Sequence, residues 1–169
     1  MATISIELSD EELRQALANL VTTLTSQGTR PAMLAIGDAL VSSTRARFSA
    51  GVTPAGAPWT GLSPVTKAIR QRKQARGNNV IAGNKPLVES GRLARNSLTH
   101  QVSSEGNAVS VGIDRFGDGR IGAALHFGTD RAGRGHKVSI PPRPFLGISD
   151  SDRNQVLDII RTALLRPAG

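Results

Sequence analysis

The glycines from Gly117 to Gly122 have the spacing that most resembles a cofactor-binding motif. They fit G-x-G-x-x-G and follow a predicted strand, as in a loop that binds a dinucleotide pyrophosphate. Such a site also needs a long crossover helix and an acidic residue about 20 residues further on. That position falls within 142–144, Pro-Arg-Pro, and no long helix follows the glycines. The glycines are therefore interpreted as part of a turn, and no cofactor is expected.

The titratable residues do not form a recognisable catalytic or metal site. His100, His126 and His136 are not paired at helical spacing, and the chain has no cysteine. There is no Gly-x-Ser-x-Gly nucleophile elbow, and no close pair of carboxylates lies in an apolar setting. His126, in Ala-Ala-Leu-His-Phe-Gly, is interpreted as a packed, hydrogen-bonded histidine. We expect neither a bound metal nor enzymatic activity.

A basic helix is the remaining candidate for chemistry. Residues 67–76 hold five cations and no acid, on a segment that Ser63 is predicted to cap and Gly77 to end. They could follow phosphates, but the segment lacks the aromatic residues that stack on bases. A solvated face or a protein-facing patch is the favoured alternative. The candidates for contact with DNA or a partner, two of them in a predicted flexible tip at 128–135, are Lys67, Arg70, Arg72, Lys73, Arg76, Arg131 and Arg134.

Composition limits the class of protein. The chain has 169 residues, the length of a single domain, and is only 3% aromatic, so the core must be mainly aliphatic. Its formal charge of +8 favours acidic partners such as nucleic acid, but it says nothing about the fold. The absence of cysteine fits assembly in a reducing compartment. Neither a signal peptide nor an apolar run of about 20 residues is visible.

Two amphipathic helices are predicted near the N-terminus. Residues 3–8 alternate as a short strand does, and residues 9–27 predict a helix that Gly28 ends. Pro31 suits the first position of a second helix, which ends before Gly51. Its predicted buried face comprises Met33, Ile36, Leu40, Val41, Thr44 and Phe48. Arg45 and Arg47 lie near its C-terminal end, where the helix dipole favours cations.

Glycine and proline dominate the connections that follow. Residues 52–64 hold three prolines and two glycines, which predicts an irregular loop anchored by Trp59 and Leu62. The other elements predicted are a helical turn capped by Ser90, an antiparallel hairpin of residues 97–103 and 108–113, a helical turn at 121–127 and a strand from Val138.

A proline-rich arm at 140–150 is the least ambiguous segment. Its three prolines fix φ and hold the residues before them in extended geometry. Gly147 permits a tight bend, among the apolar anchors Phe145, Leu146 and Ile148. Ser149 and Asp152 have the spacing of a capping box for a last helix over 150–165. The buried face predicted for that helix is Val156, Leu157, Ile160 and Leu164.

Together these elements predict an α+β fold, in which two N-terminal helices and a C-terminal helix pack on a small antiparallel sheet with long extended loops. Arg143, between two prolines, is interpreted as a structural or subunit-contact arginine rather than a phosphate ligand. Phe145 and Leu146 are predicted to lie in the core.

Four segments, in this order and spacing, resemble the phage virion morphogenesis family, the tail-completion proteins of Mu-like and P2-like tailed phages. They are Pro54-x-Gly56-x-x-Trp59-x-x-Leu62; Ser90-Gly91-x-Leu93; His126-Phe127-Gly128; and Ile140-Pro-Pro142-Arg143-Pro144-Phe145-Leu146-Gly147. The resemblance runs from about Phe48 to the C-terminus. It gives these motif residues a structural role.

The resemblance implies a structural protein without catalysis, at the neck or head-proximal end of the tail. Such proteins complete the tail and support head–tail joining, commonly as hexameric rings that contact other neck, connector and tail-tube proteins. They are assembled in the host bacterial cytoplasm and end in the virion, with no membrane contact. A ring through which genomic DNA passes also gives the positive charge a role in transient DNA contact. A non-sequence-specific DNA-binding protein that uses the basic helix is the alternative function.

Overall fold

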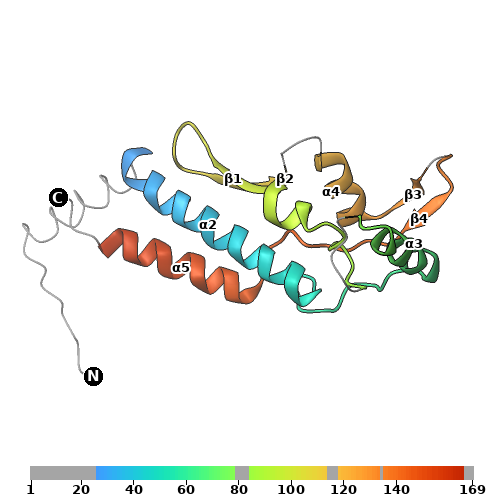
Figure 1. The fold of residues 1–169 in the computed structure, drawn as a ribbon. Coiled ribbons are helices and arrows are strands. Elements are labelled where there is room, and N and C mark those ends of the chain that lie inside the picture. The colour runs from blue at the N-terminus through green and yellow to red at the C-terminus, as the bar shows by residue number, and fades with distance from the viewer. Residues whose placement is uncertain (1–25, 79–83, 114–117, 134, 166–169) are drawn as a thin grey trace, which may run out of the picture.

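Helix α2 (Ser26–Ala50) is the axis of an elongated molecule (Figure 1). The computed structural model describes residues 26–78, 84–113, 118–133 and 135–165. Helix α5 (Asp150–Leu165) runs antiparallel along α2, and the hairpin of β1 (Leu98–Val102) and β2 (Val109–Ile113) packs on another side of α2. The strand and helix predicted within residues 3–25 lie outside the described residues.

The remaining elements gather beyond the C-terminal end of α2 (Figure 1). They are α3 (Pro64–Ala75), α4 (Asp118–Phe127), β3 (Thr129–Ala132) and β4 (Val138–Ile140), whereas the short π-helical turn η1 (Leu93–Ser97) packs against α2 itself. The described strands form two separate antiparallel pairs, β1–β2 and β3–β4. The α+β class is thus confirmed, but the C-terminal helix packs on α2 and not on a sheet.

Helix α2 starts earlier than its sequence predicts. Gly28 does not end a preceding helix, and Pro31 is the sixth residue of α2 rather than its first position. A proline this close to the start removes only the hydrogen bond to the Gln27 carbonyl, so the helix continues through it. The predicted face is confirmed, because Ile36, Val41, Thr44 and Phe48 are buried and Met33 and Leu40 are partly buried.

The β1–β2 hairpin forms as predicted, with Leu98 opposite Ile113 and Val102 opposite Val109. Its turn is closed by a bond of 2.9 Å from the Ser103 N–H to the Ala108 carbonyl. The hydroxyl of Thr29 donates to the Gly106 carbonyl at 2.9 Å, which ties the hairpin tip to the first turn of α2.

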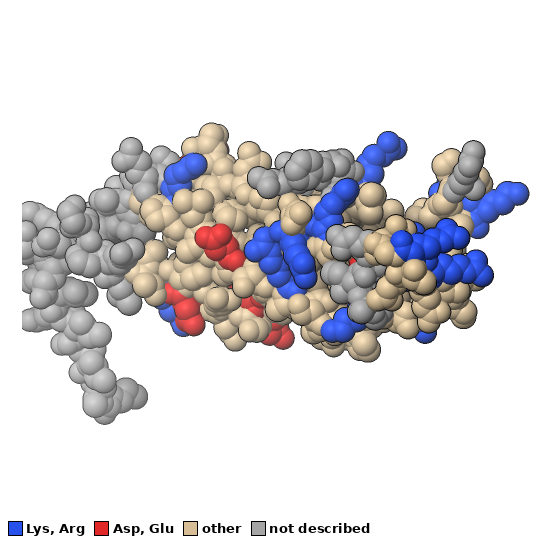
Figure 2. Space-filling view, viewed as in Figure 1, with Lys and Arg blue, Asp and Glu red and all other residues tan. Residues whose placement is uncertain are grey.

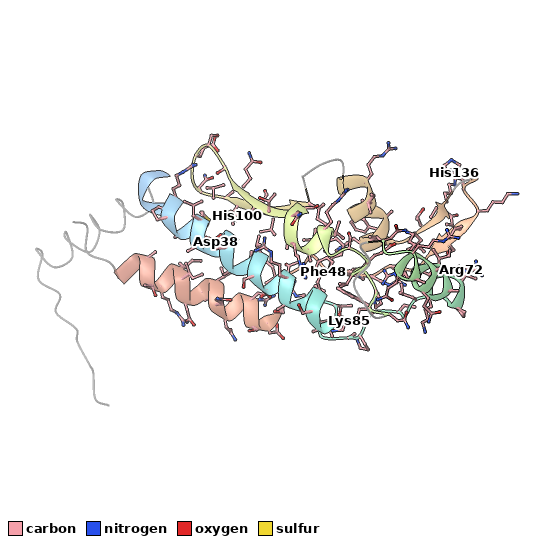
Figure 3. The ribbon with its side chains drawn as sticks, viewed as in Figure 1. Asp38, Phe48, Arg72, Lys85, His100 and His136 are labelled. Atoms are coloured by element: carbon pink, nitrogen blue, oxygen red, sulfur yellow. The ribbon has the colours of Figure 1, made fainter. Side chains whose placement is uncertain are left out.

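The absence of a side chain at Gly37 lets β1 approach α2 closely. His100 lies over the helix there, with Nδ1 3.7 Å from Asp38 Oδ1 (Figure 3). A Cβ atom on Gly37 would lie 2.4 Å from His100 Cδ2, well inside van der Waals contact.

Gly37→Ala is therefore expected to destabilise the protein, although alanine improves helix propensity by about 1 kcal/mol. The overlap with the imidazole costs about 1–3 kcal/mol and outweighs that gain. Urea unfolding of Gly37→Ala in wild-type and His100→Ala backgrounds separates the two effects. In the His100→Ala background the substitution should be neutral or stabilising, and an equal loss in both backgrounds would contradict this explanation.

The glycines of the G-x-G-x-x-G pattern do not form the expected turn. Gly119 and Gly122 lie within α4, and Gly117 lies outside the described residues. A Cβ atom on Gly122 would lie 3.0 Å from Ile113 Cδ1, and one on Gly119 would lie 3.3 Å from the Ile113 carbonyl oxygen. These glycines therefore let α4 pack closely on β2.

Three further expectations are wrong. The predicted flexible tip at 128–135 contains strand β3, which pairs with β4. Ile148, which precedes α5, is not an anchor, because 60% of its surface is accessible. Leu157 is 43% exposed, because α5 turns only part of its apolar stripe towards α2. Val156 and Ile160 are partly buried, and the side chain of Leu164 lies outside the described ones.

The hydrophobic core lies where α2 ends and the loops meet. Its buried members are Phe48, Trp59, Leu87, Leu93 and Phe145. They come from α2, the 52–64 loop, the segment before η1, η1 itself and the proline-rich arm. The core therefore joins the two ends of the elongated molecule.

Candidate functional site

The proline-rich arm is held in place by α4. The Arg143 N–H donates to the Leu125 carbonyl at 3.0 Å. The N–H groups of Phe145 and Leu146 lie 3.3 and 3.4 Å from His126 Nδ1, which accepts from both. The His126 ring also packs edge-on against Phe145, with centroids 5.0 Å apart. The interpretation of His126 as a packed, hydrogen-bonded histidine is confirmed.

This geometry requires a neutral His126 ring, with its proton on Nε2 and its Nδ1 lone pair free. Burial lowers the pKa of His126 from its ordinary value of 6.5. Protonation would also turn the acceptor into a third donor that faces two N–H groups. The contribution of His126 to stability is therefore complete at a pH above 6.5 and is lost as the pH falls through its lower native pKa.

We expect the melting temperature to fall as the pH is lowered from about 7.5 to about 5, the range in which histidine titrates. His126→Asn removes the titration and retains an acceptor oxygen, so its melting temperature should change less over the same range. His136→Asn, at an exposed histidine whose ring contacts the Arg131 carbonyl, is the matched control and should follow the wild type. An unchanged slope in His126→Asn would assign the pH dependence to another group.

The 52–64 loop packs on the same arm through Trp59. Its indole N–H donates to the Pro144 carbonyl at 2.8 Å, and its ring meets Phe48 edge-on at a centroid distance of 5.6 Å. The prediction that Trp59 anchors this loop is confirmed. Leu62, the second predicted anchor, is only partly buried.

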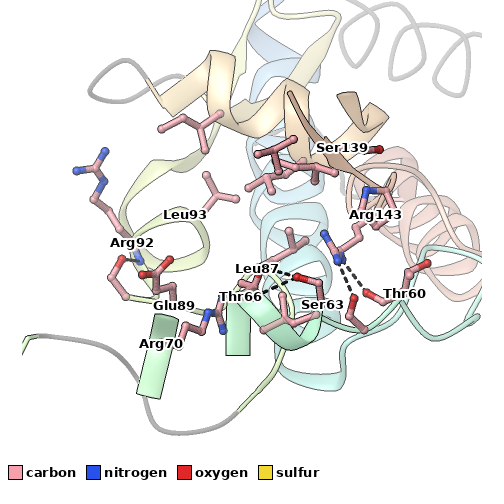
Figure 4. A pocket seen from close by; sticks show the side chains of 18 of the residues that line it. Thr60, Ser63, Thr66, Arg70, Leu87, Glu89, Arg92, Leu93, Ser139 and Arg143 are labelled. Carbon is pink, nitrogen blue, oxygen red and sulfur yellow. Dashed lines mark hydrogen bonds between the residues drawn. The ribbon is translucent and has the colours of Figure 1, made fainter. Parts of the chain in front are cut away.

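Arg143 connects the arm to the loop from the other side. It is buried, and its Nε and Nη2 donate to the carbonyls of Thr60 and Gly61 at 2.8 and 2.9 Å (Figure 4). Burial, followed by the charge of Arg70, lowers the pKa of its guanidinium group. These contacts favour the interpretation of Arg143 as a structural arginine.

Two glycines of the arm region are required by their backbone geometry. Gly128 has φ +77°, and a Cβ atom there would lie 2.8 Å from the Pro142 nitrogen. Gly147 has φ +145°, and a Cβ atom there would lie 2.8 Å from Pro54 Cγ. Side chains are strained at both angles. Gly128 therefore lets the end of α4 approach the arm at Pro142, and Gly147 lets the arm approach the 52–64 loop at Pro54.

The capping box at the start of α5 extends into a buried ion pair. The Ser149 N–H donates to Asp152 Oδ2 at 2.8 Å, and the Asp152 N–H donates to Ser149 Oγ at 3.1 Å. Arg47 Nη2 donates to the same carboxylate, and both side chains are buried. Arg47 Nη1 also donates to the carbonyls of Phe145 and Gly147 at 3.2 and 2.9 Å.

Arg47 is the main structural residue that sequence reasoning missed. Its position near the end of α2 indicates only a cation that interacts with the helix dipole. Its place between Thr44 and Phe48 on the buried stripe of α2 is the available signal, because three- and four-residue spacing puts residues on one face. The carboxylate of Asp152, 105 positions along the chain, could not be identified from this pattern.

A cavity of about 890 Å³ opens beside Arg143, between α3, α4 and β4 (Figure 4). Its walls include the motif residues Leu62, Ser90, Gly91 and Leu93. Gly91 and Leu93 are buried, and the Ser90 hydroxyl accepts from the Arg92 N–H at 3.4 Å. The motif segments thus meet at this cavity as well as at the core.

Most of the basic residues predicted to contact DNA or a partner are exposed, but Arg70 is buried. Lys67 and Arg72 are exposed on α3, Arg76 is exposed at the C-terminal cap of α3, and Arg131 is exposed on β3. Lys73 is also exposed but pairs with Glu89 at 2.6 Å. Blue side chains gather over this end of the molecule in Figure 2, and red ones lie over α2 and α5.

Arg70 differs from the other residues of α3, because it is 7% exposed and points into the protein. It is not part of the outward basic face, since helical spacing places it on the side of α3 that faces the 85–88 segment. Arg134 lies outside the described residues. Phe127, by contrast, is 76% exposed at the end of α4, although its neighbours His126 and Gly128 are packed.

The described side chains contain no group of three or more His, Asp or Glu residues that could hold a metal ion. None of the described helices combines the length and apolar character needed to cross a bilayer. The candidate functional features of the described residues are therefore a packed scaffold of motif residues and an open cavity bordered by cations.

Comparison with known proteins covers nearly the whole chain. A model of the phage virion morphogenesis family matches residues 8–165, which include all four motif segments. The chain is 30% identical over 159 residues to the Mu-like prophage FluMu G protein 2 of Haemophilus influenzae, and the match covers 94% of each chain. No solved structure matches it.

Proposed function

Because the chain belongs to the phage virion morphogenesis family, we propose that it completes the phage tail at its head-proximal end and supports head–tail joining. A role in virion morphogenesis follows from the family itself, and we propose that this role is structural rather than catalytic. The match over residues 8–165 carries the proposal, because it includes the core, the arm and the cavity together. The neck or tail of the virion is the proposed location.

A closed homo-oligomeric ring, with six copies favoured, is the proposed working form. Rings need head-to-tail contacts between two different surfaces. Among the described residues, one such surface lies at the end of the molecule that carries α3, α4 and β4. Exposed large apolar residues concentrate on α3, α4 and β4, where they are Val65, Ile69, Ile121, Phe127 and Val138. An apolar cluster of this kind favours a protein partner.

The proposed partners are other neck, connector and tail-tube proteins. Transient contact with passing genomic DNA is proposed for the exposed cations of α3. Contacts with phosphate alone do not require base recognition, so they suit DNA that moves through a lumen.

The test is phage assembly without this protein. We expect filled heads and separate tails to accumulate in extracts that lack it, and purified protein to restore joined virions. Phe127→Asp, a change at an exposed apolar residue, should fold normally but restore joining poorly. Asp158→Ala, on the exposed side of α5, is the matched surface control. Joined virions in the complete absence of the protein would contradict the proposal.

Non-sequence-specific DNA binding is the second candidate, and the exposed cations of α3 favour it. A variant with Lys67→Gln, Arg72→Gln and Arg76→Gln removes three outward charges and leaves the buried Arg70 in place. If these residues bind phosphates, the slope of log affinity against log salt should fall by about 0.9 for each phosphate that the variant no longer neutralises. Neutralising Arg153 and Arg161 on α5 is the control. Unchanged DNA affinity in the α3 variant would exclude this candidate.

A further inference from the structure

The described residues that line the cavity beside α3 include more basic than acidic side chains. The charged ones are Arg70, Arg92, Arg143 and Glu89. The carboxylate of Glu89 is already paired with Lys73 Nζ at 2.6 Å. Most other wall residues with large side chains are apolar, among them Leu62, Leu93 and Leu125. An occupant that combines apolar side chains with a carboxylate would therefore fit these walls.

Arg70 is a buried cation that has no anionic partner among the described residues. Its Nη1 donates to the carbonyls of Lys85 and Val88 at 2.8 and 3.3 Å. Its Nε is buried without a hydrogen-bond partner, and no described carboxylate pairs with it. A buried charge with an unsatisfied donor is unfavourable unless an anion reaches it.

The cavity also offers an open strand edge. β4 (Val138–Ile140) lines it, and among the described strands β4 pairs only with β3. Extended peptides bind such edges by adding a strand, with backbone hydrogen bonds on one side and side chains in neighbouring pockets. An extended peptide segment is therefore the occupant that best fits a cavity bordered by this strand.

The sequence before α2 has this chemistry. Ile4, Ile6 and Leu8 alternate as in a strand, and Glu7, Asp10, Glu11 and Glu12 supply four carboxylates. Arg14 is the only base among residues 1–25, whereas the rest of the chain holds 20 of the 21 lysines and arginines and nine of the 13 acids. The first 25 residues are thus acidic and the remainder strongly basic.

The position of Ser26 favours exchange between copies. Helix α2 begins at one end of the molecule, and α3 and β4 lie at the other (Figure 1). In a head-to-tail arrangement the N-terminal end of α2 in one copy therefore faces the end of its neighbour that holds the cavity. We propose that residues 4–12 of one copy bind in this cavity of a second copy, with residues 4–8 as a strand beside β4 and an acidic side chain of the segment paired with Arg70. This inference rests on the homo-oligomer proposed above.

Disulfide trapping tests the proposal directly, because the natural chain has no cysteine. Ile6→Cys and Val138→Cys would be introduced into separate full-length chains, which are mixed, oxidised and separated without reductant. The expected result is a disulfide-linked dimer of the two variants. Val138 borders the cavity and is about half exposed, so the substitution should not disturb folding.

Ile6→Cys mixed with Leu34→Cys is the matched control, since Leu34 is exposed on α2 far from the cavity. Equal linkage to Leu34→Cys, or no linkage to Val138→Cys, would overturn the proposal. A chain that carries both Ile6→Cys and Val138→Cys and links only within itself would also overturn it, because the segment would then occupy its own cavity. Light scattering on the same samples shows separately whether the protein forms a ring. A ring that forms without the disulfide would refute the binding of residues 4–12 but leave the proposed homo-oligomer in place.

A synthetic peptide of residues 2–12 provides a second measurement. It should bind the full-length protein and reduce the Ile6→Cys to Val138→Cys linkage. A peptide with Glu7→Gln, Asp10→Asn, Glu11→Gln and Glu12→Gln should bind about tenfold more weakly, since loss of a desolvated charge pair costs at least that factor. Equal binding of the two peptides would show that the arginines of the cavity do not recognise the segment.

Discussion

Phe145→Ala is expected to lower the free energy of unfolding by about 3–5 kcal/mol. Phe145 is 1% exposed, and its ring lies 5.1 Å from that of Phe48 and 5.0 Å from that of His126, measured between centroids. Truncation removes this ring packing and leaves a cavity, because helix α2 and the proline-rich arm are both fixed by other bonds. The arm cannot move inwards while Trp59 and Arg143 hold it.

Urea unfolding followed by tryptophan fluorescence measures this loss, since Trp59 lies in the same core. Phe127→Ala is the matched control, because the same truncation occurs at a side chain that is 76% exposed. Its effect should stay within about 0.5 kcal/mol, as is usual for surface substitutions. A loss below about 1 kcal/mol for Phe145→Ala would show that the site collapses or that the ring is not buried in solution.

The parts of the structure that were predictable depend on local chemistry. Three prolines can only form an extended arm, and Ser149 with Asp152 could be recognised as a cap from spacing alone. The same holds for Ser63, whose hydroxyl accepts from the Thr66 N–H at 3.2 Å at the start of α3. The scaffold role expected for Trp59 also rests on a local rule, that a lone large aromatic in a glycine- and proline-rich loop anchors it.

The parts that were missed depend on contacts between distant segments. The burial of Arg70 and Arg47 follows from carbonyls and a carboxylate that tertiary folding brings to them. Strand β3 is only four residues long and exists because β4 lies beside it. Gly119 and Gly122 are helical because α4 packs closely on Ile113, although glycine itself favours a turn.

The motif residues fall into two classes with different expected phenotypes. Trp59, His126, Arg143 and Phe145 hold the scaffold together, so their substitution should reduce stability and only indirectly affect assembly. Phe127 faces solvent at the end that also carries the α3 cations. A substitution there that leaves the melting temperature unchanged but reduces head–tail joining would separate an interface role from a folding role.

Asp152→Ala is expected to destabilise the protein by about 3–5 kcal/mol, the usual cost when one partner of a buried ion pair is removed. The change leaves the guanidinium of Arg47 buried with two carbonyls and two hydroxyls but no anion. It also removes the acceptor of the Ser149 N–H at the start of α5. Thermal and urea unfolding measure the loss. Asp158→Ala breaks an ion pair in which both side chains are 71% exposed, and its effect should stay below about 0.5 kcal/mol.

Asp152→Asn isolates the charge, because it keeps the shape and an acceptor oxygen. Burial opposes ionisation of Asp152, but hydrogen bonds from Ser43 and Ser149 and the charge of Arg47 outweigh it and lower its pKa from 3.8. The stabilisation by the carboxylate is therefore present above pH 3.8 and is lost as the pH falls through the lower native pKa. The stability difference between wild type and Asp152→Asn should be large at neutral pH and shrink below pH 3.8. A difference that stays constant down to strongly acidic pH would show that packing, and not the charge of this ion pair, holds α5 to α2.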